Sequence, residues 1–359
     1  MRGGEKVLEA LLDLFPQADI FTHVYDPEAV SAKIRAARVH TSFIQKLPLA
    51  RKAYQKYLPL MPLALEQLDL RGYDLVISSE SGPAKGVLTG ADTLHLCYCH
   101  TPMRYLWDMY QDYLDESGLV SRAALRLFSH YLRLWDLASA RRVDCFAANS
   151  RNVARRIAKH YGREAEVIHP PVDVDFFSPA GKDEASPEPD DYYLYVGQLV
   201  GYKRADMAVE ACARMGKKLV LIGDGPERKR LEHMAGPGAV FLGKQDGEAL
   251  RRYMRHCKAL LFPGEEDFGI VPLEAMASGR PVIAYGKGGA LETVIPGKTG
   301  LLFQEQSVSA LCGALEEFVA GVTGFSAEAL HEHAGSFSRA VFRKNFSAFY
   351  ERCRAAHTL

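Results

Sequence analysis

The chain has 359 residues, more than one ordinary hydrophobic core needs, which predicts two domains. Its 44 Lys and Arg residues balance its 44 Asp and Glu residues, so no overall charge favours nucleic-acid binding. No apolar run is long enough for a transmembrane helix, and no secretory signal peptide is visible. The seven scattered cysteines predict reduced thiols rather than a disulfide framework. We therefore expect a globular protein of the cytoplasm.

Short apolar segments alternate with helical stretches along nearly the whole chain. Candidate strands lie at 75–78, 94–98 and 145–148 in the first half, and at 192–196, 219–223, 240–242, 259–262, 282–285 and 301–303 in the second. This alternation is typical of parallel sheets covered by helices on both faces. The sequence therefore predicts an α/β fold with two doubly wound domains.

The predicted boundaries follow from one irregular stretch. Residues 178–191 are rich in proline, alanine and charge and have no periodicity, which is typical of a linker. We therefore predict an N-terminal domain over 1–172, a linker over 173–190, a C-terminal domain over 191–337 and a final helix over 338–359. Phe342, Phe346 and Phe349 supply the apolar residues of that last helix.

Two carboxylates, Glu266 and Glu274, stand eight positions apart around a Phe-Gly turn. The strand at 259–262 precedes them, so Glu266 should lie in a loop at the carboxyl end of a strand and Glu274 in the first turn of the next helix. Ligands bind at that edge of open parallel sheets. The amides of Phe268, Gly269 and Ile270 would be unpaired donors at the helix entrance, suited to an anion. Plain architecture is the alternative reading of this unit.

This segment resembles glycosyltransferase family 4, retaining enzymes of the GT-B fold whose signature is Glu-x7-Glu in this setting. The match continues through Pro281–Ala284, Gly288-Gly289, Glu292 and Gly297–Phe303, and upstream through Tyr195–Arg204 and Leu221–Pro226. Residues 99–108 resemble bacterial members that add mannose to lipid-linked O-antigen or exopolysaccharide precursors. The resemblance implies two Rossmann-like domains with an interdomain cleft, and a final helix that returns to the N-terminal domain.

The resemblance also implies roles in binding a nucleotide-sugar donor. Lys203 would bind the donor diphosphate, Glu266 the hydroxyls of the sugar and Glu274 those of the ribose. The family usually carries an arginine five residues before this lysine, where this chain has Gln198, which can donate a hydrogen bond to a phosphate but cannot neutralise it. Arg204 could supply the missing charge, or Lys203 and Arg204 could be two solvated residues at a helix start.

Five further donor-binding residues are expected from the family pattern. Gly3 and Gly4 match a Gly-Gly turn that follows the first, central strand of the N-terminal sheet. No strand precedes them here, so we expect that the true start lies upstream or that this sheet lacks its central strand. Leu242 and Gly243 would lie against the base of the nucleotide. Asp246 could read a guanine edge or cap a helix.

His100 would lie beside the donor sugar and the acceptor, so His100, Lys203 and Glu266 are the expected catalytic residues. Arg104 and Trp107 could border the acceptor or simply pack. Asp173 and Asp175 form an Asp-x-Asp pair, but their surroundings match the family 4 connection between domains. We therefore expect no metal and no cofactor beyond the donor substrate itself.

The segment from Ala29 to Ala64 contains seven basic and no acidic residues, interleaved with aromatic and aliphatic ones. Such a patch in a neutral protein predicts contact with an anionic membrane surface, through residues 33–61. An ordinary solvated basic face is the alternative. We expect peripheral association with the inner face of the plasma membrane, where a polyprenyl-diphosphate-linked glycan would be the acceptor.

The sequence thus predicts a retaining hexosyltransferase, with mannose from GDP-mannose as the first expectation. One rival is a non-hydrolysing sugar-nucleotide epimerase, which uses a similar two-domain fold. The other is a non-catalytic glycan-binding protein, which Gln198 and the absent first strand would allow. The donor, acceptor, linkage and oligomeric state are open at this stage.

Overall fold

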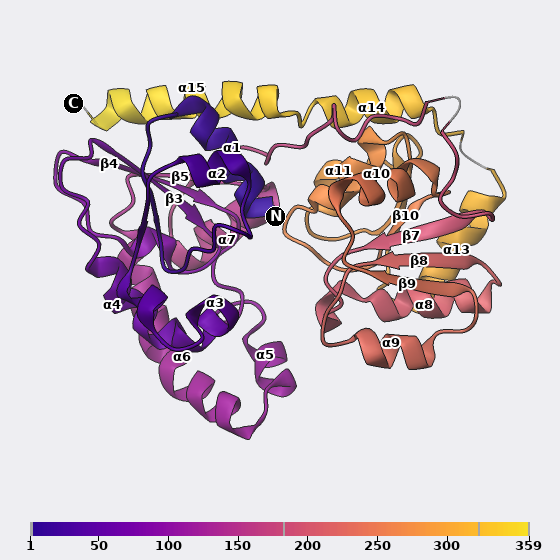
Figure 1. Ribbon diagram of the computed structural model, residues 1–359, viewed down its shortest axis with the longest axis horizontal. Helices are drawn as coiled ribbons and strands as arrows, with labels where there is room; N and C mark the ends of the chain where they lie inside the picture. Colours follow the sequence, from indigo (N-terminus) through magenta and orange to yellow (C-terminus); the bar gives the residue numbers. More distant parts are fainter. Residues whose placement is uncertain (1–2, 182–183, 322–323, 358–359) are drawn as a thin grey trace. The chain divides into compact units, whose positions relative to one another are not determined.

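The computed structural model describes residues 3–181, 184–321 and 324–357, which fold into two compact units (Figure 1). The first unit runs up to Pro170 and takes in the end of the chain again from Phe342, and the second unit is Pro171–Val341. The stretch 173–190, predicted as a linker, belongs to the second unit in this division.

The second unit is built on six parallel strands: β7 (Tyr192–Val196), β8 (Lys218–Ile222), β9 (Ala239–Gly243), β10 (Leu260–Phe262), β11 (Val282–Tyr285) and β12 (Gly300–Phe303). Their order in the sheet is β12-β11-β10-β7-β8-β9. The chain therefore builds outward from β7 in one direction and then from β10 in the other, so the topological switch point lies between these two neighbours. All six strands were predicted from the sequence.

Helices cover both faces of this sheet. They are α8 (Ala205–Arg214), α9 (Arg228–Met234), α10 (Gly247–His256), α11 (Ile270–Ala277), α12 (Ala290–Thr293), α13 (Val308–Val319) and α14 (Ala327–Gly335). Successive strand residues enter different apolar clusters, as Tyr193 packs with α8 and α13 while Leu194 packs with α11 and α14. This alternation across the pleat gives the doubly wound arrangement that we predicted.

The first unit contains two parallel sheets. The larger has the order β3 (Leu75–Glu80), β4 (Leu94–Cys99), β5 (Cys145–Ala148) and β6 (Ala165–Val167), and the smaller pairs β1 (Ile20–Thr22) with β2 (Val39–Thr41). The sequence predicted β3, β4 and β5 but missed the other three, which have only three residues each. In the described part of the chain no strand precedes the first helix, α1 (Gly3–Leu14).

The other helices of the first unit are α2 (Ala32–Ala36), α3 (Ala50–Ala53), α4 (Met61–Glu66), α5 (Tyr110–Glu116), α6 (Leu119–Ala140), α7 (Arg151–Tyr161) and α15 (Arg339–His357). Ser150 caps the start of helix α7, since its side chain accepts a hydrogen bond from the Val153 amide at 3.1 Å. Helix α15 packs on α1 and β4 of this unit through Phe342, Phe346 and Phe349 (Figure 1). None of the described helices is both long and apolar enough to span a bilayer.

Candidate functional site

The switch point of the second unit holds a pair of opposite charges. Lys203 ends the short 3-10 helix Gly201–Lys203 that follows β7, and Glu266 lies in the loop that follows β10. Because β7 and β10 are neighbours, their following loops meet at the carboxyl edge of the sheet. The Lys203 Nζ lies 2.8 Å from the Glu266 Oε1, with side chains 17% and 23% exposed. The residue predicted to bind the diphosphate, Lys203, is thus in direct contact with the residue predicted to bind the sugar, Glu266.

Glycines allow the loops around this pair to approach so closely. A Cβ at Gly264 would lie 2.7 Å from the Lys203 Cα and 2.9 Å from its carbonyl oxygen, so only glycine fits there. A Cβ at Gly289 would lie 2.2 Å from the backbone of Phe268. The Gly289 amide also donates a hydrogen bond to the Glu266 carbonyl at 2.8 Å. The loop that follows β10 and carries Glu266 therefore packs directly against the backbones of Lys203 and Gly289.

The helix α11 begins directly after this loop. Gly269 is its N-cap with φ of 82°, and Ile270 is its first residue. The first amides of a helix point out of its N-terminus, where they favour negative charge. Phe268 is buried in the apolar core beside this point, which fixes the loop. Glu274 is buried on α11, one turn further along. The predicted signature residues therefore lie together, in the loop after β10 and the helix that follows it.

The two residues expected to complete the diphosphate site differ in their contacts. Gln198 is exposed after β7. Arg204 has a left-handed backbone with φ of 53°, and its Nε lies 3.1 Å from the Asp206 Oδ1. The charge of Arg204 is therefore already balanced by a neighbour on the same helix.

The predicted base-binding residues lie at the end of β9. Leu242 and Gly243 are its last two residues, and Gly243 has φ of 68°. Asp246 caps α10, since its Oδ1 accepts a hydrogen bond from the Ala249 amide at 2.8 Å. The sequence reasoning missed Arg228, whose Nη1 would lie 3.0 Å from a Cβ at Gly243. Its position just after the Gly-Asp-Gly-Pro turn was the only available signal.

In the first unit, His100 follows β4 and is tied to the adjacent strand. The His100 Nε2 lies 2.9 Å from the Ser79 Oγ, and the His100 carbonyl accepts a hydrogen bond from the Asn149 side chain at 2.9 Å. A Cβ at Gly4 would lie 3.8 Å from the same Nε2. The structure thus brings the predicted residues Gly4 and His100 together, next to Gly3 at the start of α1.

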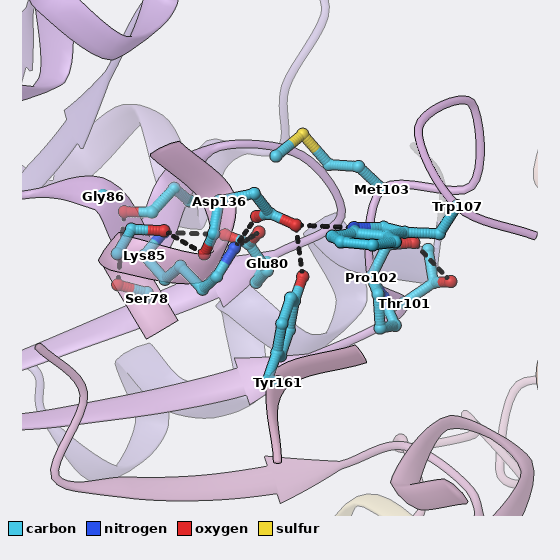
Figure 2. A network of polar contacts seen from close by, with 12 residues as sticks. Ser78, Glu80, Lys85, Gly86, Thr101, Pro102, Met103, Trp107, Asp136 and Tyr161 are labelled. Carbon is cyan, nitrogen blue, oxygen red and sulfur yellow. Dashed lines mark hydrogen bonds and ion pairs between the residues drawn. The ribbon is translucent and has the colours of Figure 1, made fainter. Parts of the chain in front are cut away.

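A fully buried ionic network lies beneath the segment that follows His100 (Figure 2). The Lys85 ammonium contacts the Glu80 Oε1 at 3.2 Å and the Asp136 carboxylate. Asp136 Oδ2 also accepts hydrogen bonds from the Trp107 Nε1 at 2.8 Å and from the Tyr161 hydroxyl at 3.0 Å. One ammonium thus lies between two carboxylates that water cannot reach.

This network connects four separate parts of the first unit. Glu80 ends β3, Asp136 comes from α6, Tyr161 ends α7 and Trp107 comes from the segment after β4. Burial raises the pKa of Glu80 to about 7, although Lys85 opposes that shift. Trp107 also stacks on His160 with ring centroids 4.8 Å apart. Of the two readings left open for Trp107, the structure shows the packing one.

The Asp-x-Asp pair lies in a turn. Asp173 accepts a hydrogen bond from the Phe176 amide at 3.2 Å, within a turn. Among residues 3–181, 184–321 and 324–357, no group of three His, Cys, Asp or Glu side chains is arranged to hold a metal ion. Independence from metal stays a prediction.

Comparison with known proteins decides the family. The model of glycosyltransferase family 4 matches residues 1–176, and the model of glycosyl transferases group 1 matches residues 179–328. A GDP-mannose-dependent alpha-mannosyltransferase of Mycobacterium tuberculosis is 30% identical over 292 residues, which cover 78% of this chain and 74% of that protein. The chain belongs to glycosyltransferase family 4. The protein of the same name from Mycolicibacterium smegmatis is also 30% identical, and the match covers 62% of its length.

Solved structures confirm the GT-B fold of this family 4 chain. The sucrose-phosphate synthase of Thermosynechococcus elongatus superposes with a TM-score of 0.73 at 23% identity, over 97% of this chain and 92% of that one. Anabaena HepE in complex with UDP and glucose gives a TM-score of 0.70 at 18% identity, over 98% and 96% of the two chains. The predicted family and fold class are therefore confirmed.

Proposed function

We propose that this family 4 chain transfers a hexose to a lipid-linked glycan with retention of configuration, with GDP-mannose as the first candidate donor. The observation that carries the proposal is the contact between Lys203 and Glu266 at the switch point, beside the N-terminus of α11. The names of two relatives favour mannose and GDP. Family membership favours transfer over the epimerase and non-catalytic readings.

The proposed chemistry concerns the charge of the leaving group. The bond between the sugar C1 and the diphosphate oxygen breaks, and the acceptor oxygen bonds to C1 on the same face. The acceptor proton passes to the departing diphosphate. Lys203 and the first amides of α11 would stabilise the charge that develops on the diphosphate oxygens. No protein carboxylate is needed as a nucleophile, so the two-carboxylate scheme of glycoside hydrolysis is not required.

The ion pair suggests how the site is kept ready for a donor. The Lys203 ammonium is paired with the Glu266 carboxylate. A bound diphosphate would replace that carboxylate on Lys203, and Glu266 would then accept hydrogen bonds from the hydroxyls of the sugar. Glu274 would hold the ribose hydroxyls, so Glu274→Gln should weaken donor binding more than turnover.

A second donor class has a specific observation in its favour. The structural neighbour HepE was solved with UDP and with UDP-glucose. Asp246, the residue that could read a guanine edge, already uses its Oδ1 to accept the hydrogen bond that caps α10. A uridine donor is therefore the alternative to guanosine at this site.

Thermal unfolding with a panel of nucleotide sugars tests the donor. A ligand that binds only the folded state stabilises it by about 2.7 kcal/mol at one hundred times its Kd. We expect GDP-mannose to raise the Tm and UDP-glucose to leave it unchanged. The reverse pattern would assign a uridine donor, and no shift with any nucleotide sugar would contradict a donor site.

Activity should also persist in EDTA, and rescue by manganese would contradict metal independence.

The membrane contact proposed for residues 33–61 rests on a smaller set of cations than the sequence indicated. Lys33 pairs with Asp13, and the Arg38 Nη2 lies 2.8 Å from the Asp19 Oδ2. The exposed cations outside these two pairs are Arg35, Lys46, Arg51, Lys52 and Lys56. Phe43 and Tyr57 in this segment are partly buried and pack against an apolar cluster.

Three charge reversals test this basic surface. Changing Arg51, Lys52 and Lys56 to Glu should release the protein from anionic vesicles at low salt, because each cation near an anionic leaflet contributes about 1 kcal/mol. High salt should have the same effect on the unchanged protein. Equal binding of the two proteins at low salt would reject this surface.

A further inference from the structure

The exposed face of α6 carries an apolar stripe. Large exposed apolar side chains on this helix are Leu119, Val120, Leu127, Phe128, Tyr131, Leu134 and Leu137. Val120, Leu127, Tyr131 and Leu134 recur at intervals that place them on one side of a helix. Leu127 is 72% exposed and Leu134 is 55% exposed. A soluble surface helix normally turns such a stripe toward its core, so this arrangement needs an explanation.

The orientation of α6 is fixed by its opposite face. Trp135 donates a hydrogen bond from Nε1 to the Glu66 Oε1 on α4 at 2.8 Å. Leu132 is buried among apolar side chains, and Asp136 belongs to the ionic network of Figure 2. Figure 1 shows α6 extending away from the four-stranded sheet. The stripe therefore faces outward because the other face is firmly packed.

Basic side chains lie along one edge of the stripe. Arg126 and His130 are exposed, and Arg133 lies on the same edge over the ring of Tyr110. The only acidic residue of α6, Asp136, is buried. The exposed face of this helix is thus apolar and basic, with no negative charge of its own.

One neighbouring surface has the same character, whereas α5, which also packs on α6, carries the exposed acidic residues Asp112 and Asp115. The exposed Leu60 and Leu63 belong to the segment that packs on α6, because Leu58 and Leu65 share an apolar cluster with Leu132 and Trp135. The exposed cations of residues 46–56 precede them in the chain. Residues 46–63 and α6 therefore adjoin each other, and both expose apolar and basic side chains to solvent.

We infer that α6 is a second docking surface for anionic lipid, adjoining residues 33–61. Leu127, Tyr131 and Leu134 enter the boundary between head groups and acyl chains, while Arg126 meets the anionic head groups. A second copy of the chain fits this face less well. Pairing α6 with itself would bring its arginine-bearing edges together, and like charges that face each other are destabilising.

The test is sedimentation of the full chain with vesicles of phosphatidylcholine and phosphatidylglycerol. The variant Leu127→Ser with Leu134→Ser removes the centre of the stripe. Its matched control is Leu291→Ser with Val319→Ser, which changes side chains of similar exposure, 56% and 55%, in the second unit. Because all four side chains are exposed, circular dichroism should show folded protein in both cases. The assay contains no sugar donor, so its result is independent of the proposed transfer reaction.

We expect the α6 variant to lower the partition coefficient about tenfold, with the loss persisting at high salt because the removed contact is apolar. Arg126→Glu should lower binding at low salt only, and the control should bind like the unchanged protein. Equal binding of the α6 variant and the control would overturn the inference. A dimer in solution that the α6 variant dissociates, without any vesicle binding, would also overturn it in favour of self-association.

Discussion

Lys203 and Glu266 form an ion pair, 2.8 Å from Nζ to Oε1, between the loops that follow two neighbouring strands on either side of a topological switch point. Each residue lies where a doubly wound sheet places its ligands. The phosphate-binding residue and the sugar-binding residue that we propose are therefore in direct contact. Each side chain therefore affects the other, and substitutions at the two positions should not be additive.

Glu266→Ala should lower kcat/KM by two to three orders of magnitude, equal to about 3–4 kcal/mol of lost transition-state interaction. The fold should persist because the loop is not a core element. Steady-state kinetics with the preferred nucleotide sugar would measure the effect. Glu265→Ala is the matched control in the same loop and should stay near the unchanged rate. Activity of Glu266→Ala within threefold of the unchanged protein would reject the assignment.

Lys203→Ala should remove nearly all activity and most donor affinity, because Gln198 is neutral and Arg204 is paired with Asp206. Isothermal titration with the donor, beside a rate assay, would separate the two effects. Gln198→Arg should be tolerated, and Lys229→Ala on the exposed face of α9 should change neither quantity. Unaltered donor affinity in Lys203→Ala would place the phosphate site elsewhere.

Gly264→Ala should disturb the site from outside it. The new methyl group would press on the Lys203 backbone, which cannot move aside as a side chain could. We expect about 1–3 kcal/mol of lost stability and a fall in kcat/KM larger than that loss of folded protein explains. Gly313→Ala is the control, because nothing lies within 4 Å of its added Cβ and it stands inside α13. That control should be neutral or slightly stabilising. Equal rates in the two variants would argue against a positioning role for Gly264.

The buried Glu80 should make stability depend on pH. Burial raises its pKa from the ordinary 4.5 to about 7, so the folded state holds a proton that the unfolded state releases between these values. The contribution of Glu80 to stability is therefore greatest at low pH and falls as pH rises toward about 7. Glu80→Gln should remove this component, which amounts to at most about 3 kcal/mol. Urea unfolding at pH 5 and pH 8 would measure it.

The control for this experiment is Glu164→Gln, which changes an exposed carboxylate of the same unit. Its pH profile should follow that of the unchanged protein. Parallel profiles for Glu80→Gln and the unchanged protein would show that Glu80 does not bind a proton on folding.

The strands that the sequence revealed are those with three or more consecutive apolar residues, such as Tyr192–Val196. The strand Ile20–Thr22 was missed because three half-buried residues carry no periodic signal. Lys203 and Glu266 could be found because each lies in a local motif beside a predictable strand. Their ion pair could not be predicted from the sequence, because it depends on which strands are neighbours in the sheet.

The same limit applies to the first unit. Glu80, Lys85 and Asp136 come from separate elements, and nothing local shows that one ammonium joins them. Glu80 lies at the end of β3 and Lys85 follows five residues later. These two charges beside an apolar strand were a signal that the sequence offered. The apolar periodicity of α6 was visible in the sequence, but its outward direction is set by the packing of Trp135 and Asp136.

The most direct test of the central claim is transfer of radiolabelled mannose from GDP-mannose to a polyprenyl-diphosphate-linked glycan, with the anomeric configuration of the product determined by NMR. The account predicts a labelled glycan with retained configuration, and its loss in Lys203→Ala and Glu266→Ala. An epimerised nucleotide sugar as the product, an inverted linkage, or transfer that is undiminished in both variants would contradict it.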